Sequence, residues 1–333
     1  EHRVALRQPM FESVLPSNSL LLDSSKGHAV HWLATWLQKQ GLSIEEVSQD
    51  APAMNDGCGA GELSPGQSWT WKELSTSGHR LIQSLTTQGV GTLLGAALDG
   101  DGDRCLLVRE TNDGVEVVDG DDIADAVLRA CTKPWKVAAS IESNLKLLSN
   151  IEENPDMEGF ETAVGDRWLS HALAPHLPHQ EQQPLLFGIE DSGHIVLPSP
   201  HPSDVNRWSL VGDGAMTLLL ALLAFEVAGT ESMQKGWKKR LSVKNPNRWM
   251  WDGRNELADT VEAMVRTHLG LAGNVAKWER MGLEGETNLM LLRCQFNGMD
   301  VSFGLRNSGT QEKTSISLCL LYTSPSPRDL LKS

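Results

Sequence analysis

The sequence predicts an α/β protein with two similar α/β units, whose sheets are mixed or parallel, followed by a smaller α+β domain. Three observations predict this fold class. Short apolar runs alternate with stretches of helical periodicity, glycines and acidic residues follow several of these runs, and 333 residues give room for two or three domains. The composition, with 40% hydrophobic and 22% charged residues, is typical of a globular chain.

The first unit is predicted over residues 17–133. It opens with an apolar strand at 19–23 and a turn at Gly27, and the helix that follows ends at Gly41, because glycine tolerates positive φ. The polar, glycine-rich residues 49–68 indicate a loop. Strands that alternate with helices favour a largely parallel sheet. Three more strands and a helix are expected at 93–98, 105–108, 115–118 and 123–130.

The second unit is predicted over residues 134–240 and the C-terminal domain over 241–318. In the second unit we expect strands at 137–141 and 185–189. We expect helices at 144–150, 166–174 and 215–227. The last of these helices is shorter than the roughly 20 apolar residues of a membrane span, so we expect it to be buried and expect no membrane contact. Residues 235–251 are interpreted as a basic connector. In the C-terminal domain we expect a helix at 256–268, strands at 289–296 and 299–305, and a glycine-containing loop at 306–310.

The last stretch of the chain, CLLYTSPSPRDLLKS at 319–333, is expected to be non-native. It contains the only tyrosine of the sequence, Tyr322. One choice of codons for it reproduces a transposon adapter used in DNA library preparation. We therefore interpret 319–333 as read-through from a truncated gene and exclude it from the fold prediction.

The charge and the cysteines exclude several classes of protein. The formal net charge is −14, which argues against a general nucleic-acid binder but allows a small anionic ligand held by a few local groups. The five cysteines are odd in number and contain no C-x-x-C pair, so neither a disulfide framework nor a zinc site is indicated. A reducing cytoplasm is the expected compartment.

The sharpest local signal is a run of three acids at alternating positions, Asp99, Asp101 and Asp103, followed by Arg104. Glycine at both intervening positions lets the chain bring the three carboxylates around one point, where a hard divalent cation relieves their repulsion. Mg²⁺ is the predicted cation. An EF-hand loop would place Glu110 at its twelfth position, but its required sixth-position glycine is Arg104 here.

Two further segments carry polar groups suited to a sugar and to a phosphate. Glu190, Ser192 and His194 alternate, so in an extended segment they would share a face and could hold adjacent hydroxyls, with His194 able to exchange a proton. Arg306-Asn307-Ser308-Gly309-Thr310 offers a guanidinium, hydroxyls and a flexible backbone to one anion. Arg167 is a weaker candidate for the same anion or for the sugar.

These motifs resemble, in their order along the chain, those of the α-D-phosphohexomutases, which interconvert hexose 1-phosphates and 6-phosphates. The resemblance rests on LDGDGDR at 98–104, VGDR at 164–167, GIEDSGH at 188–194, GDG at 212–214 and RNSGT at 306–310. SIESNLKLL and VGDRWLSHAL are most similar to phosphoglucosamine mutase, NDGCGA is similar to the acetylglucosamine-phosphate relatives, and DGDGDR is commoner in the phosphomannomutase and phosphoglucomutase branch. The branch is therefore left open.

The resemblance implies a magnesium enzyme that transfers a phosphoryl group through a phosphoserine and a bisphosphate intermediate. It implies that Glu190 and Ser192 contact sugar hydroxyls of a hexose or hexosamine phosphate and that His194, with Arg104 nearby, serves catalysis. It also implies that 306–310 grips the non-reacting phosphate.

The sequence departs from the family at two places. The family's Glu-Pro after the threonine is Gln311-Glu312 here, and the Ser-His-Asn-Pro type loop with the phosphorylated serine is absent from this sequence. We therefore expect residues 1–16 to be the remnant of that serine domain, and we expect this polypeptide alone to be inactive.

Two hypotheses from other classes stay open at this point. One is a sugar-phosphate-binding protein without catalysis, and the other is a metal phosphatase that uses the aspartates directly. A dinucleotide site is disfavoured because the glycines at 57–61 lack the spacing of the fingerprint. The identity of the hexose and the oligomeric state do not follow from the sequence.

Overall fold

The computed structural model describes residues 19–131, 134–177, 185–201, 203–231, 233–308 and 312–321. The chain forms two compact units. The first comprises the residues up to Ser143 and those from Ile151 to Met233, and the second comprises Asn144–Asn150 and the residues from Gln234 onward. The predicted division near residue 133 therefore separates two sheets of one unit.

The first sheet of the larger unit has six strands in the order β2-β1-β4-β5-β6-β3. They are β1 (Leu20–Asp23), β2 (Ile44–Glu46), β3 (Ser68–Thr70), β4 (Leu93–Leu98), β5 (Cys105–Glu110) and β6 (Gly114–Val118). β1 pairs in parallel with β2 and β4, whereas β4, β5, β6 and β3 form antiparallel pairs. The sheet is mixed rather than largely parallel, because the short connection 99–104 can only fold β4 and β5 into a hairpin.

Short helices accompany this sheet. They are α3 (Leu33–Lys39), η1 (Ala60–Glu62), α4 (Trp71–Leu74), α5 (Arg80–Ser84) and α6 (Gly120–Ala130). Leu81 and Ile82 of α5 are fully buried in a core with apolar residues of β4, β5 and β6. Gly41 follows α3 with a φ of +94°, as the predicted end of that helix requires. Asp119 caps α6 by accepting the N–H groups of Asp121 and Asp122.

The second sheet has five strands in the order β11-β10-β9-β7-β8. They are β7 (Trp135–Ser140), β8 (Met157–Thr162), β9 (Leu185–Ile189), β10 (Ile195–His201) and β11 (Asp204–Gly212). β7 is parallel to β8 and β9, whereas β9, β10 and β11 form antiparallel pairs. The chain between and after these strands forms α7 (Leu145–Glu153), α8 (Asp166–Leu173), η2 (Ala174–His176) and α9 (Gly214–Ala228). Most of α7, up to Asn150, belongs to the second compact unit.

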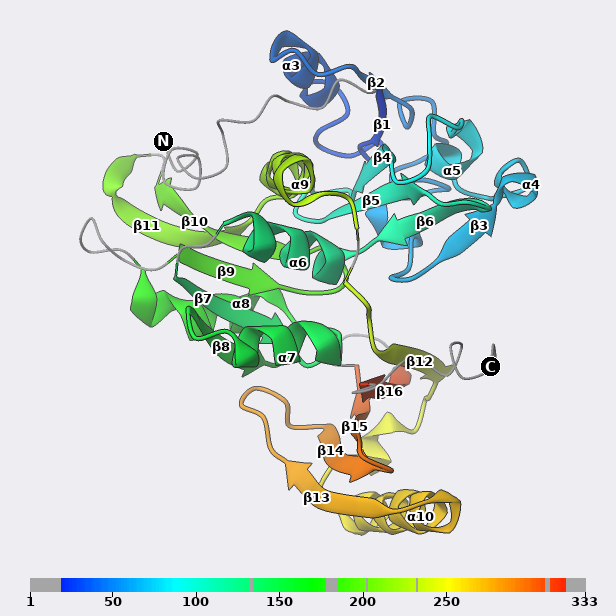
Figure 1. Ribbon diagram of the computed structural model, residues 1–333, viewed down its shortest axis with the longest axis vertical. Coiled ribbons are helices and arrows are strands. Elements are labelled where there is room, and N and C mark those ends of the chain that lie inside the picture. Colours follow the sequence, from blue (N-terminus) through cyan, green and yellow to red (C-terminus); the bar gives the residue numbers. More distant parts are fainter. Residues whose placement is uncertain are drawn as a thin grey trace. The chain divides into compact units, whose positions relative to one another are not determined.

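Two helices join the sheets of the larger unit. α6 and α9 lie side by side, α9 contacts β4 and β5 of the first sheet, and α6 contacts β9 of the second (Figure 1). The middle of α9 is buried on all sides, from Leu218 to Phe225 with one exception, as the sequence predicted for this apolar run. Across the described ranges, every helix is too short or too polar to cross a membrane.

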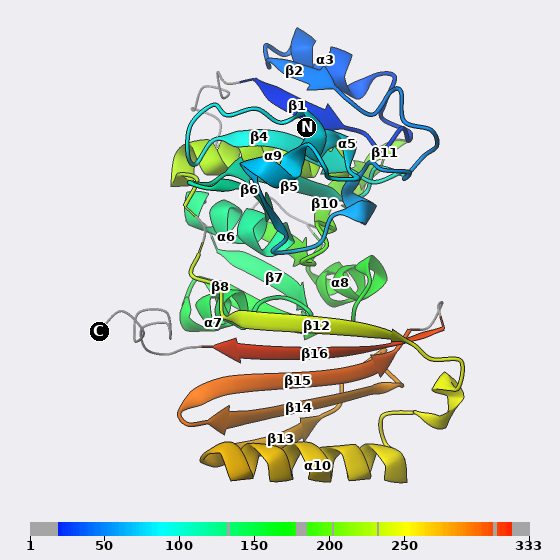
Figure 2. The same cartoon turned by 90° about the vertical axis from the view of Figure 1, so that its right-hand side faces the viewer.

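The C-terminal unit is an antiparallel sheet in the order β12-β16-β15-β14-β13, with one long helix (Figure 2). Its elements are β12 (Trp237–Lys244), η3 (Arg248–Met250), α10 (Glu256–Ala272), β13 (Val275–Met281), β14 (Leu289–Phe296), β15 (Met299–Asn307) and β16 (Lys313–Leu321). α10 packs on β13 and β14 over Ala258, Met290 and Leu292, which confirms an α+β domain.

The structure corrects the sequence prediction at two neighbouring strands of this sheet, β12 and β16. The expected connector 235–251 contains β12, an edge strand that pairs with β16 along its whole length and spans the predicted boundary at 240. Its basic and apolar residues are mostly exposed, so the strand lacks a buried apolar stripe. Cys319–Leu321, expected in the non-native tail, are part of β16. Residues 1–16 and 322–333 lie outside the described residues, so their origin stays a prediction.

Candidate functional site

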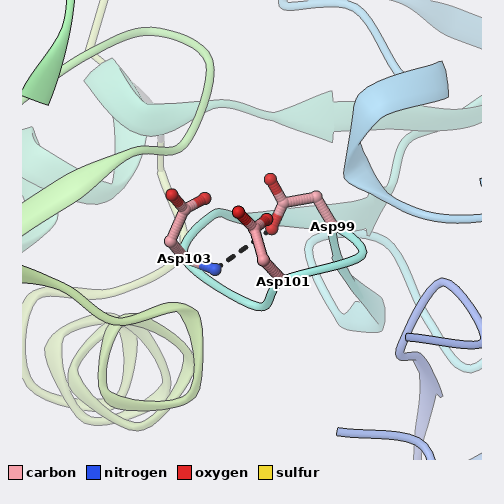
Figure 3. Close-up of side chains that lie close together, drawn as sticks. All are labelled: Asp99, Asp101 and Asp103. Atoms are coloured by element: carbon pink, nitrogen blue, oxygen red, sulfur yellow. Dashed lines mark hydrogen bonds between the residues drawn. The ribbon is translucent and has the colours of Figure 1, made fainter. Parts of the chain in front are cut away.

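The predicted metal loop is the hairpin connection between β4 and β5. One oxygen each of Asp99, Asp101 and Asp103 lies within 4.8 Å of the other two, so the three carboxylates converge as the sequence predicted (Figure 3). Asp99 Oδ1 accepts hydrogen bonds from the N–H groups of Gly102, Asp103 and Arg104 at 3.2, 3.1 and 3.1 Å. Gly102 has a φ of +82°, which lets the loop close around this carboxylate.

The loop concentrates negative charge. Burial, together with repulsion from the carboxylates of Asp99 and Asp101, raises the pKa of Asp103 to about 7. Arg104 partly offsets this charge, because its Nε lies 3.4 Å from Asp99 Oδ2 and 3.9 Å from Asp103 Oδ1. Three oxygen donors that repel one another form a site suited to a hard divalent cation.

The segment with Glu190, Ser192 and His194 is a tight turn between β9 and β10, not the extended segment that the alternation suggested. The N–H of Gly193 donates to the carbonyl of Glu190 at 3.1 Å, the N–H of Glu190 donates to the carbonyl of His194 at 3.0 Å, and Gly193 has a φ of +85°. The hairpin pairing of Ile189 with Ile195 imposes this turn. The alternation therefore does not place the three side chains on a common strand face.

Glu190 is nevertheless the polar centre of this turn. Its carboxylate accepts hydrogen bonds from Ser192 Oγ at 3.3 Å and from the N–H of Gly165 at 2.5 Å. Burial raises the pKa of Glu190, whereas the Gly165 N–H and His194 lower it. The VGDR segment thus reaches the turn through its glycine. Arg167 is exposed at the start of α8, where its guanidinium lies 4.9 Å from the ring centre of Trp168.

This turn lies directly on the metal loop. The N–H of Cys105 donates to the carbonyl of Gly193 at 3.0 Å, and Arg104 and His194 form an antiparallel bridge. His194 Nε2 then lies 3.7 Å from Asp103 Oδ2. The structure therefore joins the predicted metal-binding and sugar-binding residues into one site.

The predicted phosphate segment lies in the C-terminal unit, where β15 ends. Arg306 Nη1 donates to Glu286 Oε1 at 3.2 Å. Asn307 is buried: its side-chain amide donates to the carbonyls of Arg248 and Trp251, and its Oδ1 accepts from Thr314 Oγ1 at 2.6 Å. The Asn307 side chain thus binds the backbone at Arg248 and Trp251. Gly309 and Thr310 lie outside the described residues.

One support of the site was given no role from the sequence. His79, the residue just before α5, is buried with Nε2 3.1 Å from the carbonyl of Gly59 and 3.8 Å from Asp23 Oδ2. Asp23 accepts the N–H groups of Gly59 and Ser25, both at 2.8 Å, and burial raises its pKa. These contacts fix the loop after β2, whose Asn55 lies beside Gly100 of the metal loop. No local sequence pattern signals the contacts of Gly59 with Asp23 and His79, because they join segments 20 or more residues apart.

A cavity of about 370 Å³ opens next to the metal loop. Asp101 and Asp103 line it together with Asp213 at the start of α9 and the tryptophans Trp32 and Trp36 of the α3 region. Asp101 and Asp103 of the loop are therefore accessible to a small ligand.

Comparison with known proteins gives the same assignment as the motifs. The family model "Phosphoglucomutase/phosphomannomutase, alpha/beta/alpha domain III" matches residues 119–240. The phosphoglucosamine mutase of Streptomyces avermitilis is 29% identical over 294 residues, which are 84% of this chain and 54% of that protein. That of Leuconostoc mesenteroides is 31% identical over 215 residues, 63% of this chain and 40% of that protein. This chain thus spans about half the length, or less, of these curated relatives.

Solved structures share the fold. The N-acetylphosphoglucosamine mutase of Aspergillus fumigatus, crystallised with GlcNAc-6P and magnesium, superposes with a TM-score of 0.63 and 17% identity over 97% of this chain and 66% of that one. An N-acetylglucosamine-phosphate mutase in its product complex gives a TM-score of 0.62 and 14% identity over 96% and 61%. The motif order, the loop geometry and the sequence relatives agree, and in all three respects this chain is similar to the α-D-phosphohexomutase family.

Proposed function

We propose that this chain carries the metal-binding, sugar-binding and phosphate-binding parts of a phosphohexomutase most similar to the phosphoglucosamine mutases. The reaction would interconvert the 6-phosphate and 1-phosphate of a hexosamine or hexose through a phosphoserine and a bisphosphate intermediate. The observation that carries the proposal is the close approach of His194 to the aspartate cluster through Asp103.

Asp99, Asp101 and Asp103 would hold Mg²⁺. Two features of the chain support this fit. One is the convergence of the three carboxylates, and the other is the raised pKa of Asp103, which is caused first by burial and then by repulsion from Asp99 and Asp101; a cation would offset both. When bound, Mg²⁺ supplies positive charge that stabilises a transferring phosphoryl group. A Phe or Leu in place of one of these aspartates would have contradicted the fit.

His194 and Arg104 would act on the reacting groups. His194 is buried beside Asp103, where its Nε2 can take a proton from an attacking hydroxyl or return one to a leaving oxygen. Arg104 is half-exposed next to the same carboxylates and has donors available in a planar fork for a phosphate oxygen. Both side chains come from the bridge between the loop and the turn.

Glu190 and Ser192 would orient the sugar. Glu190 Oε2 and Ser192 Oγ already share a hydrogen bond at 3.3 Å, so adjacent sugar hydroxyls could bridge or replace it. Arg167 is exposed two residues after Gly165, whose N–H donates to Glu190. Arg167 is proposed to reach the anionic end of the ligand.

The non-reacting phosphate would bind at 306–310, with Arg306, Ser308, Gly309 and Thr310 as the contacting residues. Asn307 is proposed to contribute through its backbone and to hold the segment through its side chain, because its amide already binds two carbonyls. The reducing cytoplasm is the proposed compartment, in keeping with five buried cysteines that form no disulfide.

The proposal is tested with the intact gene product, supplied with Mg²⁺ and a hexose 1,6-bisphosphate. We expect conversion of glucosamine 6-phosphate, and a comparison with glucose and mannose 6-phosphates decides the branch, including the phosphomannomutase/phosphoglucomutase alternative. Lack of conversion of all three sugars would contradict the proposal. Release of inorganic phosphate by the 333-residue chain alone would instead favour the phosphatase hypothesis.

A further inference from the structure

We propose that the tripeptide Gly212-Asp213-Gly214 positions both halves of the site, the proton-transfer histidine and the metal loop. Gly212 would leave the space that the His194 ring occupies, and Gly214 would fix the conformation of the metal loop at 99–104. The inference rests on the proposed function for its meaning, but its geometry and its tests concern only the contacts of these residues.

Gly212 leaves no space for a side chain. It is the last residue of β11, and a Cβ built on it would lie 2.2 Å from His194 Nε2 and 2.8 Å from His194 Cδ2. Because real Cβ atoms do not approach other atoms so closely, any larger residue must displace the ring. The ring is buried, and its Nε2 faces Asp103 at 3.7 Å, so a displacement would change that contact.

Gly214 makes an equally close approach to the metal loop. Its N–H donates to the carbonyl of Gly102 at 2.9 Å. A Cβ on Gly214 would lie 2.4 Å from the carbonyl oxygen of Arg104 and 2.8 Å from that of Gly102. These are backbone atoms of the loop, which cannot move aside as the end of a side chain can. An alanine at 214 would therefore shift the loop itself.

Asp213, which lies between the two glycines, is the capping residue of α9. Its Oδ1 accepts the N–H of Met216 at 2.9 Å, and its carbonyl accepts from the N–H and the hydroxyl of Thr217, both at 2.8 Å. These bonds cap α9, whose apolar length is buried against β4 and β5. The start of α9 is thereby held against the hairpin that carries the aspartates.

The carbonyl of Gly100 is held in a similar way at the other end of the loop. It accepts the N–H of His28 at 2.9 Å, and a Cβ on Gly27 would lie 2.1 Å from it. The loop is therefore clamped through two glycine carbonyls, by the turn after β1 and by the start of α9. Groups that hold metal ligands in place typically change metal affinity about 10- to 100-fold when altered.

The first test measures Mg²⁺ binding by titration calorimetry on the 333-residue chain. We expect Gly214→Ala to weaken binding by about 10-fold or more. Gly61→Ala is the matched control, because a Cβ there meets no atom within 4 Å, and it should bind as the unchanged chain does. Equal affinity of a folded Gly214→Ala variant and the control would overturn the inference.

A pair of variants at Asp213 keeps the test decisive if Gly214→Ala does not fold. Asp213→Asn loses the charge but keeps a capping acceptor, whereas Asp213→Ala loses both. We expect weaker Mg²⁺ binding by Asp213→Ala than by Asp213→Asn. Equal binding by the two would mean that the capping acceptor of Asp213 does not affect Mg²⁺ binding, and would contradict a positioning role.

The second test concerns Gly212 and needs no metal. We expect Gly212→Ala to lower the thermal unfolding midpoint of the chain, and to lower it far less when His194 is already alanine, because the clash partner is then absent. If Gly212→Ala does not fold, His194→Ala should restore folding. An equal loss in both backgrounds would overturn the assignment of Gly212 to His194.

A spectroscopic measurement separates positioning from simple packing. In the unchanged chain, Mg²⁺ should shift the ring NMR signals of His194, since Asp103 lies next to its Nε2. A folded Gly212→Ala variant should lose most of that shift, and retention of the full shift would contradict the inference. Failure of the mutase assay with these results intact would reject the proposed function alone.

Discussion

His194 Nε2 and Asp103 Oδ2 lie 3.7 Å apart, although one residue ends the turn after β9 and the other lies in the hairpin loop between β4 and β5. Two backbone contacts create this approach: the bridge between Arg104 and His194, and the hydrogen bond from Cys105 to the carbonyl of Gly193. A titratable ring is thereby held next to the proposed cation site. This relationship makes the following outcomes measurable.

Asp103→Asn should weaken Mg²⁺ binding strongly. The substitution removes one of three converging carboxylates and one unit of charge, so we expect at least about a 10-fold rise in the dissociation constant. Titration calorimetry measures it. Asp50→Asn, at an exposed residue after β2, is the matched control and should leave the affinity unchanged. Equal effects of the two substitutions would reject Asp103 as a ligand.

Mg²⁺ binding should depend on pH around neutrality. The pKa of Asp103 is raised from 3.8 to about 7, so below that pH the carboxyl keeps a proton that the cation must displace. Affinity should fall by up to about 10-fold per pH unit below 7 and level off above pH 8. Calorimetry in buffers of different ionisation enthalpy would also detect the released proton. A flat profile between pH 6 and 8 would contradict this titration.

The raised pKa of Asp103 also predicts how the stability of the fold changes with pH. A raised acid pKa means that the folded chain binds the proton more tightly than the unfolded chain, so the charged Asp103 destabilises the fold as the pH rises from about 4 through 7. Mg²⁺ should therefore raise the unfolding midpoint more at pH 8 than at pH 6. Midpoints measured by scanning fluorimetry with and without Mg²⁺ test this order, and a larger gain at pH 6 would refute it.

His194→Gln in the intact enzyme should lower kcat by a larger factor than the factor by which it changes KM. Glutamine retains hydrogen-bonding groups but cannot transfer a proton, and general acid–base catalysis contributes about 10²- to 10⁴-fold. Steady-state kinetics with the preferred sugar phosphate gives the split. His31→Gln, at an exposed residue, serves as the control and should keep full activity. An unchanged kcat in His194→Gln would remove this residue from the proton-transfer role.

Asn307→Ala should destabilise the C-terminal unit. It removes the side-chain amide that donates to the carbonyls of Arg248 and Trp251. It also removes the acceptor of the Thr314 hydroxyl, and loss of such buried hydrogen bonds costs about 1–3 kcal/mol. Native-state hydrogen exchange should show faster exchange near η3 and the end of β15. Asn247→Ala, at an exposed position, should not change it. Unaltered exchange in Asn307→Ala would show that the buried amide bonds contribute little.

Local patterns predicted much of the fold because they were strong. The apolar runs that became β4, β5 and α9 are buried almost throughout, and the glycine after α3 has the positive φ that its position indicated. β12 was missed because an exposed edge strand needs no apolar stripe. The mixed character of the first sheet depended on the hairpin at 99–104, whose pairing direction the strand pattern does not state.

The site divides in the same way. The aspartate loop was predicted because its ligands and glycines are consecutive, and it folds within one hairpin. The turn geometry at 190–194 was not, since alternation suggests an extended strand while the pairing of Ile189 with Ile195 imposes a turn. The close packing of Gly212 on His194 and the role of Asn307 are tertiary contacts between distant segments, which no local pattern encodes.

The most direct test of the account is the anomalous scattering of Mn²⁺, used in place of Mg²⁺, in crystals of this chain. The account predicts one strong peak at coordination distance, about 2.0–2.3 Å, from an oxygen of each of Asp99, Asp101 and Asp103. The same density should show His194 still beside Asp103. A loop without a peak, in crystals whose Mn²⁺ concentration saturates ordinary carboxylate sites, would contradict the account.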